Sequence, residues 1–498
     1  MGAQQLDGYL SSEETWRGRF WLPASPDNIQ RGTLTYTPDK GVRLVLIGGF
    51  DDAVWLPTEN PHTRVLSSRS RQWPVIHAAV GNQPVTLVDC VAVSSSSYFM
   101  GKEIEEQTIR AEMCLFGVLL TDPSAQVFSQ ISIEIENLTE WDYRPDVMWK
   151  VEHPETARRP TRWDISVEPA EPRAVVVDDL TVELHRWYRL PSHDNRRGRL
   201  EAATFAVSYF KLSAPEPKSV DEWMDTAGVI QDLITLAMDA PCAVLKAELK
   251  PTDQLKAEPN SAARDDVTVY ARHVVNGDPD ASSVHGREAS FTLGVEGVDY
   301  EDIVPRWLTI REQFRVACDM ILSLIYRSEG YIQPQLITAV AAAEAFHQAL
   351  GLKPPIANAE FNRLKKALKA VIPDERKKWL SEKLGRNGHT LRERLQDLAS
   401  RPDAQVMAQL LPNPDGWIDA AKGARNLVAH GGEADDDVAR MYAITEVSMA
   451  VVIVNLLHEL RIPNKRIIET MTTTGRLTRA ARLAREQWPA KAAMPTVG

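Results

Sequence analysis

The sequence has 498 residues, of which 44% are hydrophobic and 25% are charged, and its formal net charge at pH 7 is −11. This composition is typical of globular proteins and excludes disordered and collagen-like chains. The longest apolar run, Met449 to Val454, is far shorter than the ~18 residues of a membrane span, so we expect no membrane partner. The first residues, MGAQQLDGYL, lack the basic and apolar parts of a secretion signal, which favours a cytoplasmic protein.

The charge is distributed unevenly along the chain. Residues 1–300 carry 29 Lys and Arg against 45 Asp and Glu, a net of −16, whereas residues 301–498 carry 28 against 23, a net of +5. We therefore expect any surface that binds a polyanion in the second part. The four cysteines are far apart and have no clustered histidines, so we expect buried thiols and no cysteine metal site.

The first 210 residues alternate short apolar segments with turn residues. G-T-L-T-Y-T (32–37) ends at Pro38-Asp39, and R-L-V-L-I-G (43–48) ends at Gly48-Gly49. This pattern predicts antiparallel strands in a large sandwich-like domain. The predicted strands are Arg19–Leu22, Gly32–Tyr36, Val42–Ile47, Val85–Val93, Arg110–Leu120, Gln130–Glu136, Ala174–Leu184 and Ala202–Leu212.

A helix interrupts this β pattern. Ser219 and Glu222 form a capping-box sequence, and the apolar residues that follow have helical spacing, which predicts a helix over about 219–239. Strands are expected again at Ala243–Leu249, Val267–Val275 and Ala289–Val295. Residues 1–300 are thus predicted to be a β-rich domain with an inserted helix.

From residue 301 the pattern is helical. The predicted helices are Arg306–Tyr326, Gln335–Leu350, Asn358–Val371, Asp374–Leu384, Leu391–Leu398, Pro414–Ala429, Asp435–Leu460 and an amphipathic stretch from Lys465 to about Trp488. The predicted fold class is therefore α+β, with an antiparallel β-rich domain over 1–300 and an all-α bundle over 301–498.

Three polar residues gather near the end of one predicted helix. In A-K-G-A-R-N-L-V-A-H-G-G (421–432), the two final glycines supply the left-handed conformation that ends a helix. Asn426 and His430 share a face, and Arg425 reaches the same place through its long side chain. A histidine that titrates near neutrality and a fixed cation can act on an RNA phosphodiester without a metal ion.

The same residues also have a simpler interpretation. A histidine in the last turn of a helix is more often a cation that interacts favourably with the helix dipole than a catalyst. An Arg-x4-His spacing is too short a pattern to decide between the two.

The wider sequence resembles a known family. R-N-L-V-A-H-G resembles the Arg-Asn-x-x-x-His form of the motif found in HEPN domains. The segments A-A-A-E-A-F-H (341–347) and L-R-E-R-L (391–395) are similar to the HEPN domain of ApeA-like anti-phage proteins. G-R-F-W-L-P (18–23), G-T-L-T-Y-T-P (32–38) and G-V-R-L-V-L-I-G (41–48) are similar to the β-rich N-terminal domain that accompanies it, so the resemblance covers nearly the whole chain.

The resemblance implies a metal-independent endoribonuclease with no cofactor. Arg425 and His430 would be the catalytic pair, and Asn426 would hold the imidazole or the phosphate. A 2′-hydroxyl would attack the adjacent phosphate, leaving a cyclic phosphate and a 5′-hydroxyl. The expected target is a tRNA anticodon loop, because exposed single-stranded loops can present a splayed 2′-hydroxyl.

Other residues are candidates for supporting roles. Glu344 either pairs with Arg425 or orients His430, unless it is an exposed helix residue bound only to water. The basic stretch R-L-K-K-A-L-K (363–369) is the expected phosphate-tracking surface, through Lys365, Lys366 and Lys369, although such stretches are usually solvated faces. Lys422, close to the motif, is a further candidate for binding RNA.

The resemblance also implies partners. HEPN domains commonly pair about a two-fold axis, so we expect a homodimer or a higher homo-oligomer with a composite site. Met441, Ile444, Met449 and Val452 are candidates for that interface, although a buried core helix explains them equally well. The acidic region 1–300 is the expected sensor of a phage-derived trigger, with abortive infection as the outcome.

The alternative to a ribonuclease is a non-catalytic HEPN protein that binds RNA or another protein.

Overall fold

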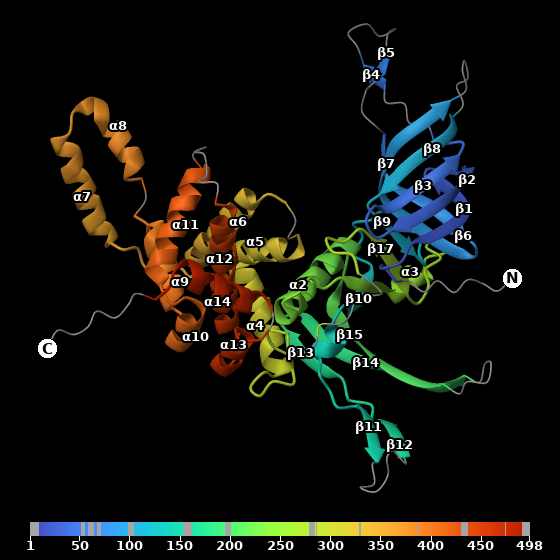
Figure 1. The fold of residues 1–498 in the computed structure, drawn as a ribbon. Coiled ribbons are helices and arrows are strands. Elements are labelled where there is room, and N and C mark those ends of the chain that lie inside the picture. The colour runs from blue at the N-terminus through green and yellow to red at the C-terminus, as the bar shows by residue number, and fades with distance from the viewer. Residues whose placement is uncertain are drawn as a thin grey trace. The chain divides into compact units, whose positions relative to one another are not determined.

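The computed structural model describes residues 9–50, 55–57, 64–66, 71–97, 104–152, 162–194, 201–277, 284, 286–327, 330–385, 387–429, 437–473 and 475–490. The chain divides into two compact units (Figure 1). The β-rich unit contains residues 1–286 and 292–294, and the helical unit contains residues 287–291 and 295–498. The predicted α+β order, with β structure first and helices second, is confirmed.

The β-rich unit is built around one sheet with thirteen strands in the order β13-β14-β15-β10-β16-β17-β9-β7-β6-β1-β2-β3-β8. The strands are β1 (Glu14–Leu22), β2 (Ser25–Thr37), β3 (Gly41–Ile47), β6 (Gln72–Val80), β7 (Gln83–Ser97), β8 (Ile104–Ala111), β9 (Met113–Phe116), β10 (Phe128–Ile135), β13 (Arg173–Val177), β14 (Leu180–Asp194), β15 (Glu201–Lys218), β16 (Val244–Pro251) and β17 (Val267–Ala271). Two further pairs are β4 (Trp55–Pro57) with β5 (Arg64–Leu66) and β11 (Val147–Glu152) with β12 (Arg162–Val167).

One part of this sheet closes into a barrel instead of forming the predicted sandwich. Strand β8 pairs with β3 on one side and with β7 on the other, so β7, β6, β1, β2, β3 and β8 form a closed ring. The strand β7 makes closure possible because its first half pairs with β9 and its second half pairs with β8. Register shifts between Ala92 and Ser94 and between Ser96 and Ser97 mark irregularities that bend this long strand.

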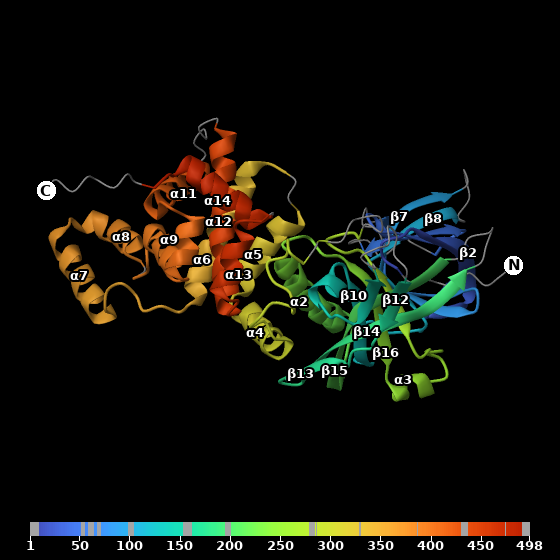
Figure 2. The same cartoon turned by 60° about the horizontal axis from the view of Figure 1, so that its bottom comes forward.

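The rest of the sheet is open and carries the inserted helix α2 (Val220–Met238), which packs against β10 (Figure 2). Both hydrogen bonds of the predicted capping box, between Ser219 and Glu222, are present. Trp223 is buried, and its Nε1 donates to the carbonyl of Phe128 at 2.9 Å. This bond fixes the helix across the strand. Two short helices, α1 (Leu138–Trp141) and α3 (Asp253–Ala257), complete the unit.

Several predicted strands differ from the structure. The run Arg110–Leu120 divides into β8 and β9 at Glu112, and Ala174–Leu184 is a hairpin that turns at Asp178, whose φ is 54°. The predicted strand Ala289–Val295 is wrong, because this segment consists of turns. Strand β6 was not predicted, because its internal Pro74 removes a backbone donor and argues against a strand.

The helical unit surrounds one long helix. Its members are α4 (Tyr300–Gln313), α5 (Arg315–Tyr326), α6 (Ile332–Ala349), α7 (Asn358–Val371), α8 (Asp374–Lys383), α9 (Leu391–Ser400), α10 (Ala404–Leu410), α11 (Pro414–Ala429), α12 (Val438–Glu459), α13 (Asn464–Thr470) and α14 (Arg476–Gln487). Helix α12 is long and apolar enough to cross a membrane, but 89% of its apolar window is buried inside the structure. It is therefore the core helix of the bundle, packed against α6 and α14.

The helix boundaries correct the predictions in three places. The predicted helix Arg306–Tyr326 begins earlier, at Tyr300, and divides at Phe314 into α4 and α5. The stretch from Lys465 to Trp488 divides near Gly475, whose φ is 114°, into α13 and α14. Helix α10, after Asp403, was not predicted; the Asp403 carboxylate accepts from the backbone of Gln405 at 2.8 Å and thereby caps its start.

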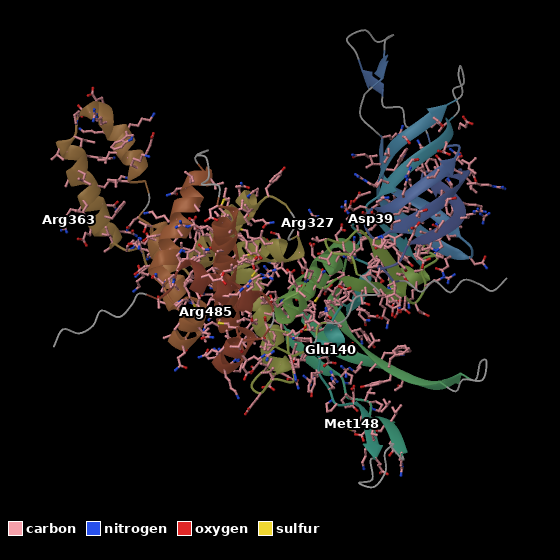
Figure 3. The ribbon with its side chains drawn as sticks, in the orientation of Figure 1. Asp39, Glu140, Met148, Arg327, Arg363 and Arg485 are labelled. Carbon is pink, nitrogen blue, oxygen red and sulfur yellow. The ribbon has the colours of Figure 1, made fainter. Side chains whose placement is uncertain are left out.

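Helices α7 and α8 form a hairpin that stands away from the rest of the helical unit in both views (Figures 1 and 2). No residue of either helix is buried in the structure, which describes both helices completely. Figure 3 shows that side chains surround this hairpin, with Arg363 among them. Between residues 358 and 383 eight Lys or Arg oppose four Asp or Glu. The hairpin is thus a basic projection held mainly by its two ends.

Candidate active site in the helical unit

Helix α11 carries the residues of the predicted motif. Its first half is anchored in the core by Trp417, Ile418 and Ala421, all of them buried, and Trp417 Nε1 donates to Ser448 Oγ at 3.3 Å. Its second half emerges into solvent, where the Arg425 side chain is 38% exposed and Asn426 is exposed. The helix therefore holds these two residues on a rigid support without covering them.

Glu344 of α6 lies between two arginines. Its Oε1 is 3.5 Å from Arg425 Nη2, and its Oε2 is 3.8 Å from Arg394 Nη1. The Glu344 side chain is 24% exposed and that of Arg394 is 23% exposed. One carboxylate thus orients two guanidinium groups, which keep further N–H donors for an anionic ligand.

Arg394 was not among the predicted site residues. It follows the N-terminal capping box Thr390-x-x-Glu393 of α9, both of whose hydrogen bonds are present, and its Nε donates to the carbonyl of His389 at 3.1 Å. On the same helix Arg392 forms an ion pair with Asp419 of α11. Nothing in the local sequence separates Arg394 from other helix-surface arginines, because its role depends on how α9 packs against α6.

The other member of the predicted catalytic pair, His430, lies outside the described residues, as do Gly431, Gly432 and residues 433–436. Helix α11 ends at Ala429, directly before them. The chain returns at Asp437, whose carboxylate accepts from the backbone of Arg440 at 2.9 Å and caps α12.

The predicted RNA-binding lysines differ in their surroundings. Lys365, in the middle of α7, donates through Nζ to the carbonyl of Leu384 at 2.9 Å and so joins α7 to the end of the hairpin. Lys366 is exposed and Lys369 is partly exposed on the same helix. Lys422 is exposed on α11, three residues before Arg425.

The residues proposed for a dimer interface on α12 are buried inside the unit. Met441, Ile444, Met449 and Val452 are all between 0 and 7% exposed, so the argument for dimerisation from these four residues was wrong. A shallow cavity of about 220 Å³ does lie between α11 and α12, and Leu427, Val428 and Met441 contribute to its wall. Leu427, Val438 and Tyr442 are exposed apolar or aromatic residues on the same two helices.

A second polar cluster lies in the helical unit. His347 Nε2 and Asp397 Oδ2 are 2.7 Å apart, and the rings of His347 and His389 meet edge to face with centroids 5.0 Å apart. No metal ligands were predicted here, because residues 347, 389 and 397 are too far apart in the chain to form a spacing pattern.

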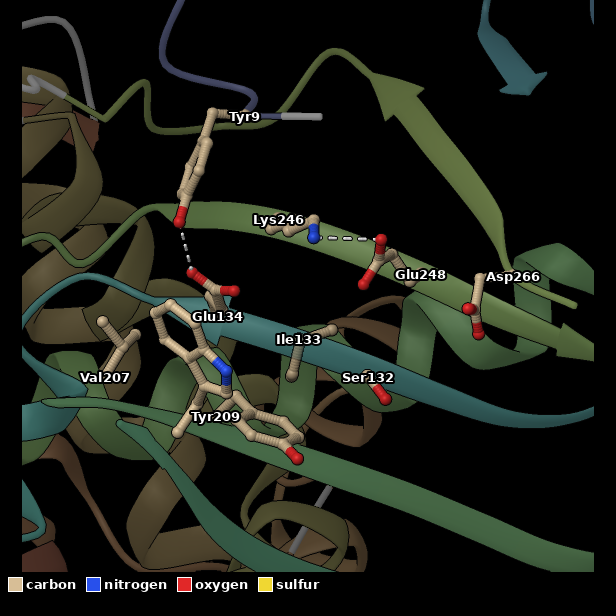
Figure 4. A pocket seen from close by; sticks show the side chains of 10 residues that line it. Tyr9, Ser132, Ile133, Glu134, Val207, Tyr209, Lys246, Glu248 and Asp266 are labelled. Carbon is tan, nitrogen blue, oxygen red and sulfur yellow. Dashed lines mark hydrogen bonds and ion pairs between the residues drawn. The ribbon is translucent and has the colours of Figure 1, made fainter. Parts of the chain in front are cut away.

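A larger cavity belongs to the β-rich unit and contains none of the predicted site residues. It has a volume of about 390 Å³ and lies on the sheet surface formed by β10, β14, β15 and β16 (Figure 4). Tyr9 donates to Glu134 at 3.2 Å, and Lys246 pairs with Glu248 at 3.0 Å across its wall. Burial raises the pKa of Glu134 despite the nearby Lys246.

Comparison with protein families accounts for both units. The family model described as ApeA N-terminal domain 1 matches residues 15–307, and the model described as Apea-like HEPN matches residues 337–466. The chain belongs to the ApeA-like HEPN family. No curated protein and no solved structure matches the chain.

Membership of this family indicates the general function of the protein. The ApeA-like HEPN family is one of anti-phage defence proteins, and its HEPN domain suggests ribonuclease activity. The matched region of this ApeA-like HEPN protein contains Glu344, Arg394 and Arg425 as well as the α7–α8 hairpin. Helices α4, α5 and α14 lie outside that region and belong to the bundle that supports it.

Proposed function

We propose that the protein is a metal-independent endoribonuclease of anti-phage defence, in which Arg425 and His430 act on the RNA backbone. The observation that supports this proposal most directly is the environment of Arg425. Its guanidinium is partly exposed at the end of a rigid helix and is oriented by Glu344, and His430 follows five residues later in the chain. A structural arginine would be covered and fully hydrogen-bonded, whereas this one can still receive a phosphate.

The proposed reaction is an intramolecular transfer at phosphorus. The imidazole of His430 takes the proton of a 2′-hydroxyl, the O2′–P bond forms, and the P–O5′ bond breaks. The departing 5′-oxygen takes up a proton, and the products are a cyclic phosphate and a 5′-hydroxyl. Arg425 stabilises the charge that develops on the phosphoryl oxygens, and Asn426 holds either the imidazole or the phosphate. DNA lacks the attacking hydroxyl and would not be cut.

The RNA surface extends from the motif to the basic hairpin. Lys422 lies on α11 near Arg425, and Lys366 and Lys369 project from α7, where they would contact phosphates. Lys365 contributes charge but also closes the hairpin through Leu384. A tRNA anticodon loop is the proposed target, because a splayed loop nucleotide exposes both its 2′-hydroxyl and its phosphate.

A second copy of the chain completes the proposed site. One helix end supplies one histidine, whereas the reaction needs a proton acceptor and a proton donor. A two-fold contact through the exposed residues of α11 and α12, Leu427 and Tyr442 among them, would bring two motifs to one cleft. The cavity between these helices could receive an apolar side chain of the second copy.

We assign control of the proposed ribonuclease activity to the β-rich unit. An enzyme that cuts host RNA must be inactive before infection, so we propose that this unit responds to a phage-derived trigger in the cytoplasm and that cleavage then causes abortive infection. Expression of residues 301–498 alone should be more toxic than expression of the full chain. A folded fragment that is harmless would instead show that the β-rich unit is needed for activity.

The deciding experiment is incubation of the purified full-length protein with total cellular RNA, with and without phage lysate, followed by mapping of the new ends. Cyclic phosphate and 5′-hydroxyl ends are expected, and they should persist in excess EDTA. Arg425→Ala and His430→Ala should abolish cleavage, whereas Arg315→Ala, an exposed arginine on α5, should not. RNA binding without cleavage in the wild-type protein would favour a non-catalytic binding protein. Activity restored by Mg²⁺ after EDTA would contradict the metal-independent chemistry.

A further inference from the structure

Two histidines and an aspartate converge at one place in the helical unit. His347 lies on α6, Asp397 lies on α9, and His389 lies directly before the capping residue of α9. One potential ligand atom from each residue lies within 4.8 Å of the corresponding atoms of the other two. The shortest separation, from His347 Nε2 to Asp397 Oδ2, is 2.7 Å.

The surrounding structure holds all three residues in place. His347 is only 3% exposed, and its helix packs against α5, α9, α11 and α12. The start of α9 is fixed by the capping box between Thr390 and Glu393, and Arg394 binds the carbonyl of His389. The donors of the cluster therefore come from two packed helices and from the residue directly before the N-cap of α9, which is the kind of support that a metal ligand needs.

The donor set matches zinc. Two imidazole nitrogens and one carboxylate oxygen, with an open fourth position for water, are a common ligand set for Zn²⁺, whereas Ca²⁺ and Mg²⁺ prefer oxygen ligands alone. Donors about 2.0–2.2 Å from a tetrahedral ion lie about 3.3–3.6 Å from one another. Asp397 is 42% exposed and His389 is partly exposed, so both side chains have room to shift to these separations around the buried His347.

The position of His389 gives such an ion a structural consequence. The α7–α8 hairpin returns to the bundle at residues 384–390, and its two ends are joined by Asn387, whose Nδ2 donates to the Ile356 carbonyl at 2.6 Å and to Asn358 Oδ1 at 2.9 Å. His389 is two residues farther along. Since no residue of α7 or α8 is buried in the structure, the placement of the hairpin depends on these connecting residues.

We propose that His347, His389 and Asp397 bind one Zn²⁺ ion, which fixes the base of the α7–α8 hairpin to α6 and α9. The ion would hold these elements together. It would bind none of Arg425, Asn426 and His430, so the proposed cleavage chemistry does not use it.

The test uses the full-length protein, freed of any histidine tag and purified in the presence of zinc. Elemental analysis should find about one zinc per chain, and Co²⁺ added to the metal-free protein should give the visible absorption of a four-coordinate site. Zinc at about 100 times its dissociation constant should raise the midpoint of thermal unfolding of the helical unit by at least about 5 °C. It should also slow proteolysis and hydrogen exchange at residues 384–390.

Three variants separate a metal site from an ordinary hydrogen bond. Asp397→Asn keeps an acceptor for His347 but loses the anionic ligand, so it should remain folded and lose zinc. His389→Gln should also lose zinc, whereas His458→Gln, a histidine of α12 outside the cluster, should keep it. Wild-type protein that is folded but binds neither zinc nor cobalt would overturn the proposal. Zinc retained by Asp397→Asn and His389→Gln, or iron in place of zinc, would overturn it as well.

These outcomes are independent of the ribonuclease proposal. Metal-free protein that still cleaves RNA agrees with a structural ion, and its binding of RNA should weaken because the hairpin is less fixed. Zinc-loaded protein that cuts no RNA would contradict the proposed activity and leave the metal site intact.

Discussion

Arg186 in the β-rich unit and Arg425 in the helical unit both bind carboxylates, but their surroundings differ. Arg186 is 3% exposed, and its Nη1 lies 2.7 Å from each carboxylate oxygen of Asp146. Its Nε donates to Ser208 Oγ at 2.9 Å, and its Nη2 donates to the Thr139 carbonyl at 3.0 Å. Arg425 is 38% exposed and, among the described residues, makes one ion pair at 3.5 Å. Arg186 therefore stabilises the fold, whereas Arg425 keeps N–H donors that can bind a ligand.

The pKa values of the two carboxylates around Arg186 show how strongly this arginine interacts with them. Burial alone would raise the pKa of Asp146, but hydrogen bonds from Arg186 and Tyr188 outweigh it and lower the pKa. At Asp142, which is fully buried, burial prevails and raises the pKa despite Arg144 and Arg186. Removal of the Arg186 guanidinium would therefore leave the buried Asp146 carboxylate without its cation and Asp142 with Arg144 alone.

The largest expected effect is on the free energy of unfolding, and it follows from the different burial of Arg186 and Arg425. Arg186→Ala should lower the free energy of unfolding of the β-rich unit by about 3–5 kcal/mol, whereas Arg425→Ala should change that of the helical unit by less than about 1 kcal/mol. Hydrogen exchange during denaturant titration reports the two units separately and measures both values. Similar losses from the two substitutions would mean that Arg425 is also a structural residue.

The second prediction concerns geometry at the motif. Arg425→Lys keeps the charge but loses the planar guanidinium that can bind two phosphate oxygens, so cleavage should fall about 100-fold. Stability should stay unchanged, because the pair with Glu344 is partly exposed. End mapping on a fixed RNA substrate, together with thermal unfolding of the same preparation, measures both quantities. Full activity in Arg425→Lys would assign this residue a purely electrostatic role.

The third prediction concerns the stability of the β-rich unit at low pH. Burial lowers the pKa of His273 to about 4, and its Nε2 has no hydrogen-bond partner among the described residues. Because the folded-state pKa lies below the ordinary value near 6.5, the stability that the neutral ring provides is complete above about pH 6.5 and is lost as the pH falls towards 4. The loss should be about 2 kcal/mol, less than the full shift because the residue is partly exposed.

The matched variant for this prediction is His273→Phe, which removes the titrating group. Its free energy of unfolding should change less between pH 6.5 and 4 than that of the wild type, and denaturant titration at several pH values measures the difference. An unchanged pH dependence would show that the acidic clusters of the unit, and not His273, control its stability in acid.

The sequence predicted most of the elements but few of the contacts. The bounds of α7 and α11 follow from local signals, namely an Asn at the start of α7 and a Pro at the start of α11. The two capping boxes follow from a Ser or Thr three residues before a Glu. Closure of the barrel could not be predicted, because it depends on β7 pairing with both β8 and β9 along its length. Arg394 and the His347 cluster were missed for the same reason: side chains from different helices meet only after the bundle has formed.

The smallest expected effect distinguishes lysines within the basic hairpin. Among the described residues, Lys366 and Lys369 make no hydrogen bond or ion pair, whereas Lys365 donates to the carbonyl of Leu384. The double substitution Lys366→Gln and Lys369→Gln should weaken RNA binding a few-fold and reduce the slope of log K against log salt concentration by about 1–2, because each phosphate contact releases about one counterion. Lys365→Gln should lower the salt slope by no more than about 1 but should also increase hydrogen exchange near Leu384. Binding isotherms at several salt concentrations measure the slopes, and an unchanged slope in the double variant would place the RNA on another surface of the helical unit.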